Sequence, residues 1–318
     1  MRTFVTYIAA LAAAFTFALS AVAQQRSARE VPEEETLRPS MVKDLLKRRT
    51  WLLGVGTMVL AYVLQAIALG FGDVAIVEPI VASELIFAVP LAVRRAGKRP
   101  GPREWTGVVL AAAGVGAFLI AASPTRGNTT PSIVHLLYGF GPWIIVFVAL
   151  VLLARGPEGP RRAGLLAAAA GVSFGLLSLL TKSGVSVLTR HGVAALVSTW
   201  QPWVLLLIGA AGFLVSQSAY QAAPLASSLP IMDALEPISA VVLAAYVLNE
   251  RISLAPIDVA VELVGAVATV TGIFLLGRSP LVLAIYETTE RSKKRGELDT
   301  PGESGAPGGS PREARARH

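Results

Sequence analysis

The chain has 318 residues, of which 53% are hydrophobic and 15% are charged, and its mean hydropathy is +0.60. Soluble domains carry about a quarter charged residues, so this composition indicates an integral membrane protein. The net charge of +7 does not indicate a nucleic-acid partner, because the basic residues lie in short loops and a tail between apolar runs. The absence of cysteine excludes disulfides and thiolate metal sites, and three scattered histidines argue against an imidazole site.

Nine apolar stretches are long enough to cross a bilayer, which takes about 20 residues. They are continuously apolar and longer than barrel strands, which predicts helices. The predicted fold class is therefore all-α, a polytopic integral membrane protein with about nine transmembrane helices. In chain order the stretches are 4–23, 51–71, 74–93, 105–122, 134–154, 163–182, 201–220, 225–247 and 258–277.

The first stretch also has the features of a secretory signal peptide. Arg2 precedes an apolar core, and Ala21-Val22-Ala23 forms a small-residue cleavage motif. Cleavage would export the following segment, 24–50, which holds seven Lys and Arg residues. We expect the stretch to be retained as the first span, although the sequence alone leaves both outcomes open.

The distribution of Lys and Arg predicts the orientation of the chain in the membrane. Twenty-three of the 28 lie on one side, in loops 24–50, 94–104 and 155–162 and in the tail, and five lie on the other. Because basic residues accumulate in cytoplasmic loops, we expect a plasma-membrane protein with its N-terminus outside and its C-terminus in the cytoplasm. Trp51 and Trp105 begin spans at the inner interface, where aromatic belts form.

An internal repeat divides the chain. Residues 65–89 align without gaps on residues 217–241, with six identical pairs in 25 positions that include Gln65/Gln217 and Glu84/Glu236. Two further pairs of segments match in the same order, which predicts an inverted 4+1+4 arrangement of the spans, typical of transporters. The expected parts are 1–123 (first repeat), 124–162 (connecting helix), 163–280 (second repeat) and 281–318, a largely disordered cytoplasmic tail.

Acidic residues near the middle of two predicted spans are the strongest candidates for a binding site. A carboxylate at that depth costs several kcal/mol and is functional by default. Glu84 and Glu236 are repeat mates that could face one cavity, and Asp233 lies three residues before Glu236 on the same helical face. These three residues are the expected metal ligands if the site binds a cation, and they could equally carry protons. Each could also be a protonated, hydrogen-bonded structural acid.

Three further polar residues complete the predicted substrate or ion site. Gln65 and Gln217 could bind a cation or substrate, or could serve as interhelical hydrogen-bonding residues. Glu78, at the outer end of its span, could be a vestibule ligand or a hydrated helix end. Neither a phosphate-binding loop nor a grouping of catalytic residues is present, so the sequence predicts no enzyme and no cofactor.

The inverted duplication and the Leu248-Asn249-Glu250-Arg251 turn before the last span resemble the drug/metabolite transporter superfamily. The segments Phe17–Ala28 and Trp51–Leu69 are similar to bacterial members of its EamA-like group, and the NIPA-like magnesium transporter branch looks closest. The resemblance covers about residues 1–280 and implies an integral membrane transporter of the ten-helix type with one or two helices reduced. Its motifs are more diagnostic of fold than of the transported solute.

The resulting hypothesis is a secondary transporter that moves a small molecule or ion by alternating access. The first version transports a magnesium-type divalent cation or is coupled to cations or protons. An alternative is a proton-coupled metabolite exporter, in which Gln65, Gln217 and Trp143 contact substrate. Another is a membrane scaffold without transport. The expected partners are the solute and the lipid bilayer, with no nucleic acid, and the sequence leaves room for a homo-oligomer.

Overall fold

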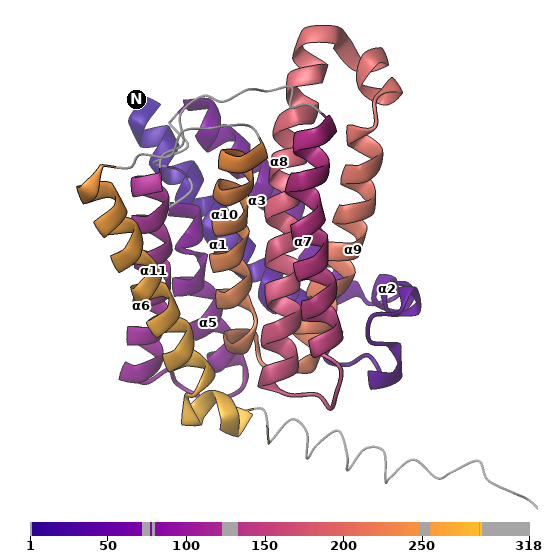
Figure 1. Cartoon of the computed structure of the whole chain (residues 1–318). Coiled ribbons are helices and arrows are strands. Elements are labelled where there is room, and N and C mark those ends of the chain that lie inside the picture. Colours follow the sequence, from indigo (N-terminus) through magenta and orange to yellow (C-terminus); the bar gives the residue numbers. More distant parts are fainter. Residues whose placement is uncertain are drawn as a thin grey trace, which may run out of the picture.

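The computed structural model describes residues 2–71, 77, 80–122, 133–247, 255–285 and 287, which form a bundle of helices without strands (Figure 1). The helices are α1 (Arg2–Ala28), η1 (Glu33–Glu35), α2 (Pro39–Leu46), α3 (Arg49–Phe71), α5 (Glu84–Arg95), α6 (Pro102–Ala122), α7 (Ile133–Leu153), α8 (Pro160–Ser198), α9 (Gln201–Ala222), η2 (Leu225–Ser227), α10 (Leu229–Val247) and α11 (Pro256–Gly277).

Within the described residues, seven helices are long and apolar enough to cross a membrane. In addition, the Phe140–Leu153 part of α7 forms a shorter apolar helix. Large apolar side chains on the outside of the bundle are highly exposed, including Leu53 at 69%, Ile145 at 70% and Leu207 at 71%. Such a surface is stable only against hydrocarbon, because in water it would aggregate. The predicted fold class, a polytopic all-α membrane protein, is confirmed.

Several elements differ from the expected spans and loops. In the described part of the stretch 74–93, α5 begins only at Glu84, after a turn at Ser83. The helix predicted over 163–182 continues to Ser198 as α8, with a non-helical residue at Gly192, where φ is +80°. The stretch 225–247 begins with a separate 3-10 turn, η2, before α10. Loop 24–50 contains η1 and the short helix α2, whose buried Met41 and Leu45 pack against the bundle.

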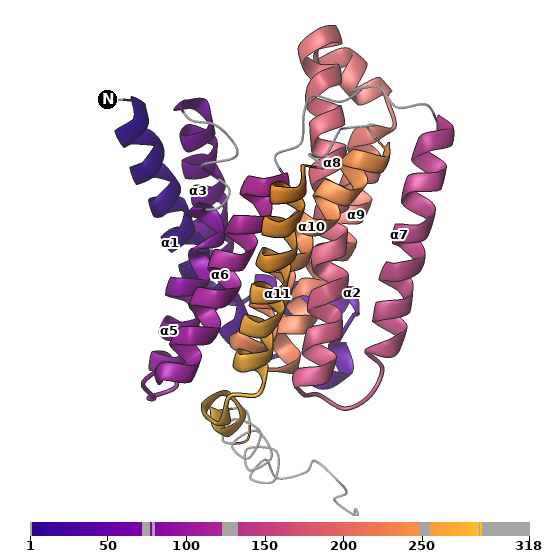
Figure 2. The same cartoon turned by 60° about the vertical axis from the view of Figure 1, so that its left-hand side comes forward.

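The helices pack in pairs that follow the proposed repeat. In the first half α1 lies along α3 and contacts α5, and in the second half α8 lies along α9 and α10. Helix α6 lies along α11, so the last helices of the two halves are in contact. Helix α7 contacts α8 and α10 at the periphery of the bundle (Figures 1 and 2). This pairing is what an internal repeat of four helices would produce, and the domain boundaries stay a prediction.

Glycines allow the closest of these contacts. A Cβ atom at Gly114 of α6 would lie 2.5 Å from the carbonyl oxygen of Gly265 on α11, and one at Gly272 would lie 2.5 Å from the amide nitrogen of Ala111. No side chain fits at these distances, so the two helices meet backbone to backbone. The α6–α11 pair therefore depends on small residues rather than on large apolar side chains.

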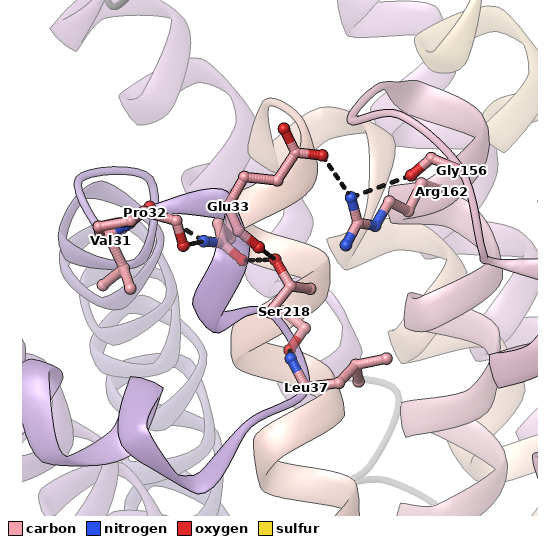
Figure 3. A network of polar contacts seen from close by, with 9 residues as sticks. Val31, Pro32, Glu33, Leu37, Gly156, Arg162 and Ser218 are labelled. Atoms are coloured by element: carbon pink, nitrogen blue, oxygen red, sulfur yellow. Dashed lines mark hydrogen bonds and ion pairs between the residues drawn. The ribbon is translucent and has the colours of Figure 1, made fainter. Parts of the chain in front are cut away.

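The segment after α1 is bound to α8 and α9 by polar contacts (Figure 3). Gln221 donates from Nε2 to the carbonyl oxygens of Val31 and Pro32 at 2.9 and 2.8 Å. Arg162 donates to Glu33 at 2.8 Å, and the amide of Leu37 donates to Ser218 Oγ at 3.2 Å. Leu37 has a φ of +62°, which is unfavourable for a leucine, so these contacts hold a strained turn in place.

Helix α1 belongs to the interior of the bundle. Ala10, Ala13, Ala14 and Ala18 are fully buried, and the helix contacts α3, α5 and α9. Loss of residues 1–23 would leave the facing sides of these helices uncovered. We therefore keep the expectation that the first stretch is retained as a span.

Candidate functional site

Glu84 begins α5 directly after a break in the helical backbone. Residues 80–82 are helical, Ser83 forms a turn with φ −68° and ψ 0°, and α5 starts at Glu84. The Ser83 hydroxyl donates to the carbonyl oxygen of Ile80 at 2.5 Å, which satisfies one acceptor at the break. The side chain of Glu84 is buried, with 9% exposed. The predicted mid-span carboxyl group therefore lies inside the bundle at a helix terminus.

Asp233 and Glu236 lie on α10, where small residues bring that helix against α8. A Cβ atom at Gly171 would lie 2.8 Å from the carbonyl oxygen of Met232, and one at Gly175 would lie 2.7 Å from that of Glu236. Pro237 lacks an N–H group, so the carbonyl of Asp233 loses its usual helical donor. Asp233 interacts with Glu84 of α5, and both acids of α10 interact electrostatically with Tyr220 of α9.

The carboxyl groups of Glu84 and Asp233 form a hydrogen-bonding pair. A hydrogen bond between two carboxyl groups requires that one of them carry a proton, since an ionised carboxylate is only an acceptor. Asp233 Oδ2 is shielded from solvent and has no hydrogen-bond partner among the described residues. The two halves of the chain thus each contribute one member of a buried acidic pair.

Tyrosine and a third acid surround this pair. Tyr220 on α9 is 7% exposed and interacts electrostatically with Glu84, Asp233, Glu236 and Tyr62. Glu236 also interacts electrostatically with Asp233. A phenol offers one hydroxyl donor in a region otherwise rich in acceptors. We refer to Glu84, Asp233, Glu236 and Tyr220 as the acidic cluster.

The predicted metal set does not converge into a metal-ion cage. Across the described ranges, no group of three or more Asp, Glu, His or Cys side chains is placed to hold a metal ion. Glu84 and Asp233 meet directly, while Glu236 approaches them as a nearby charge. The arrangement can therefore hold a proton between two carboxyl groups as it stands, whereas an all-protein metal site would need further movement of the side chains.

Gln217, in contrast, is fully engaged in an interhelical network. It is 0% exposed, accepts from Trp51 Nε1 at 3.0 Å and donates to Gln24 Oε1 at 2.8 Å. Gln24 in turn donates to Ser20 Oγ at 2.8 Å, and Ser20 donates to the carbonyl oxygen of Gly54 at 2.8 Å. These residues, the amide network, join α1, α3 and α9. Of the two roles predicted for Gln217, the geometry supports the interhelical one.

The remaining predicted residues have separate outcomes. Gln65 is half-buried on α3 and has a polar interaction. Glu78 lies outside the described residues. Trp51, expected in the interfacial belt, is instead 4% exposed and hydrogen-bonded to Gln217, because its indole N–H finds a buried acceptor there. The sequence interpretation missed Tyr220, although it follows Gln217 by three positions and so shares its helical face.

Comparison with known proteins relates one part of the chain to a family. Residues 35–121, which span α2, α3, α5 and α6, match the EamA-like transporter family. An uncharacterized protein of Corynebacterium glutamicum is 32% identical over 246 residues, which cover 76% of this chain and 84% of that protein. No solved structure matches the chain.

Proposed function

Because residues 35–121 match the EamA-like transporter family, we propose that the chain is a proton-coupled secondary transporter that moves a small solute by alternating access. The observation that carries this proposal is the buried contact between Glu84 and Asp233. Intramembrane acids that face one another and the bundle interior are the usual elements of proton relays. The match of residues 35–121 supports transport rather than catalysis, and the coupling ion is our inference from the acidic cluster.

The acidic pair would couple proton binding to the arrangement of the two halves. With one shared proton, a hydrogen bond links Glu84 on α5 to Asp233 on α10 and draws these helices together. When the site opens to water on one side and the proton leaves, two carboxylates would face each other in a medium of low dielectric constant and repel. The halves would then separate, and the Tyr220 hydroxyl could donate to the carboxylate that has lost its proton.

The proposal is tested in proteoliposomes with an imposed pH gradient. Internal acidification or alkalinisation is followed with a trapped pH-sensitive dye while a panel of amino acids, amines and organic acids is added in turn. A solute that drives proton movement identifies the cargo. We expect Glu84→Gln and Asp233→Asn to abolish that movement, whereas Glu34→Gln, which removes an exposed acid in η1, serves as the matched control and leaves it unchanged.

A divalent cation of the magnesium type is the second candidate cargo. The supporting observations are the electrostatic effect of three acids on Tyr220 and the Asp233 oxygen that has no hydrogen-bond partner among the described residues. Magnesium keeps several of its waters, so two carboxylates could bind it without a complete protein cage. Magnesium uptake that is abolished in Asp233→Asn and moves no protons would replace the first proposal with this one. Absence of flux for every solute and for magnesium would contradict both and favour a scaffold.

A further inference from the structure

A cavity lies away from the acidic cluster, at the end of the bundle where α1 and α5 finish. Its volume is about 490 Å³, and it is enclosed by the last turns of α1 and α5, by the segment 224–226 and by the helical turn after α11. Figure 2 shows that turn beneath the bundle, beside the end of α5. Both halves of the chain therefore contribute walls to this cavity, and none of the transport residues discussed above lines it.

Arginine dominates the charged part of the lining. Arg26, Arg29 and Arg95 line the cavity together with one acid, Glu30. The carboxylate of Glu30 is already occupied, since Arg48 donates to it and Arg26 approaches it at 3.8 Å. The cavity thus has a net positive charge, and its guanidinium groups have the planar, forked geometry that matches phosphate oxygens.

The inner wall of the same cavity is apolar and well packed. Val22 and Val93 are 2% exposed, and Leu225 and Val282 are 1% exposed. The turn that carries Val282 is anchored, because its amide donates to Ser279 Oγ at 3.2 Å and the Ser279 hydroxyl donates to the buried Glu104 of α6. The cavity therefore combines a basic rim with a rigid apolar wall.

We propose that this cavity binds the phosphate headgroup of an anionic phospholipid. The ends of α1 and α5 mark the level of the headgroups on the side of the basic loops, and basic pockets between transmembrane helices recognise anionic lipid headgroups. The arginines would hold the phosphate, and the apolar wall would receive the glycerol and the first part of an acyl chain. A soluble phosphate ester shares the charge of this ligand but makes no use of the apolar wall.

The experiment measures lipid binding to the full-length protein in detergent. Phosphatidylglycerol or phosphatidylcholine is titrated in, and lipid-bound species are counted by native mass spectrometry. We expect retention of one phosphatidylglycerol and much weaker phosphatidylcholine binding. Loss of two or three charged contacts in the triple variant Arg26→Gln, Arg29→Gln, Arg95→Gln should weaken phosphatidylglycerol binding at least about tenfold. Substitution of the same three arginines by Lys keeps the positive charge but removes the bidentate guanidinium geometry. The loss of phosphatidylglycerol binding should therefore be intermediate.

The matched control removes equal charge from the same end of the molecule without touching the cavity. Arg94→Gln, Lys98→Gln and Arg99→Gln together fulfil this, since none of the three lines the cavity, and phosphatidylglycerol binding should change less than about twofold because only nonspecific attraction is lost. Equal losses in both triple variants would overturn the site. Binding of glycerol 3-phosphate with the same dependence on the three arginines would overturn the lipid assignment. Elution volume and thermal midpoint confirm that each variant is folded.

Discussion

Two buried polar groups of residues lie in the same bundle and differ in how completely their hydrogen bonds are satisfied. In the amide network, Gln217, Gln24 and Trp51 exchange neutral hydrogen bonds at normal distances across α1, α3 and α9. In the acidic cluster, Glu84 and Asp233 bring two acidic groups together, and one oxygen of Asp233 lacks a partner among the described residues. Both groups of residues are removed from water, yet only in the amide network do the polar atoms all have hydrogen-bond partners.

We interpret this difference as one between a structural role for the amide network and the proposed functional role of the acidic cluster. A satisfied neutral network fixes the relative position of helices and has one low-energy state. An acidic pair has two states, with and without its proton, and these states attract or repel the helices that carry them. The amide network should therefore hold α1, α3 and α9 together while the acidic cluster changes state. Four substitutions can break or sharpen this distinction.

The largest expected effect is on transport in Asp233→Asn. The amide cannot be ionised, so position 233 can no longer release and rebind a proton, and removal of a group that transfers protons reduces rates by about 100-fold or more. Solute-driven proton flux in proteoliposomes measures this, and the thermal midpoint in detergent should change little. Retention of more than half of the flux would show that Asp233 is not the proton carrier.

Gln217→Leu should reverse this pattern. Trp51 Nε1 and Gln24 Oε1 would each lose a buried partner, and each unsatisfied group costs about 1–3 kcal/mol, so we expect a stability loss of about 2–4 kcal/mol. The thermal midpoint should fall, whereas flux per folded molecule should remain within about twofold, because the network carries no charge. Gln221→Leu, which frees loop carbonyls outside this network, is a comparison variant on the same helix. Flux lost together with stability would assign Gln217 to the transport site.

Glu236→Gln tests the acid of the cluster that interacts with Asp233 by charge alone. Glu236 acts on Asp233 as a nearby charge, so neutralising it should alter the pH at which Asp233 exchanges its proton without removing the exchange. We expect flux at a fixed pH to change by about tenfold or less, which corresponds to about 1.4 kcal/mol. The measurement is flux as a function of pH. A loss as complete as that of Asp233→Asn would make Glu236 an equal partner in the site.

The smallest effect is expected for Trp51→Phe. The change removes the indole N–H that donates to Gln217 and keeps an aromatic ring beside Phe213, whose centroid lies 6.0 Å from that of Trp51. A single lost hydrogen bond lowers stability by about 1 kcal/mol. Thermal unfolding followed by circular dichroism measures the change, and transport should be unaffected. A shift as large as that of Gln217→Leu would show that ring packing, rather than the hydrogen bond, stabilises this contact.

Most of the fold could be predicted from the sequence because hydrocarbon imposes a simple rule on the chain. A helix that satisfies its own backbone and faces lipid needs a long apolar run, and such runs are visible without knowledge of their neighbours. The ends of the helices were less predictable, because α8 continues well beyond residue 182 and the 3-10 turn η2 precedes α10. The η2 turn is buried within the bundle, whereas the end of α8 is largely exposed, with Val193 at 66% and Val197 at 55%.

The three acids of the candidate site could be named from the sequence, whereas Tyr220 and the pairing of the acids could not. Burial depth alone identified Glu84, Asp233 and Glu236, because an acid in the middle of an apolar run is expensive wherever it points. The repeat suggested that Glu84 would face Glu236, whereas its hydrogen-bonding partner is Asp233. Gln217 was found by the same logic, but its engagement with Trp51 and Gln24 was not.

The sequence by itself therefore determined the all-helical membrane fold class, the apolar exterior and the presence of acids inside it, since each depends only on the transfer of residues between water and hydrocarbon. Only the tertiary structure decided which acid meets which. That pairing depends on the approach and rotation of α10 against α8, set by backbone contacts at Gly171 and Gly175, and on the start of α5 after the turn at Ser83. Such contacts join residues distant in the chain, so no local pattern contains them.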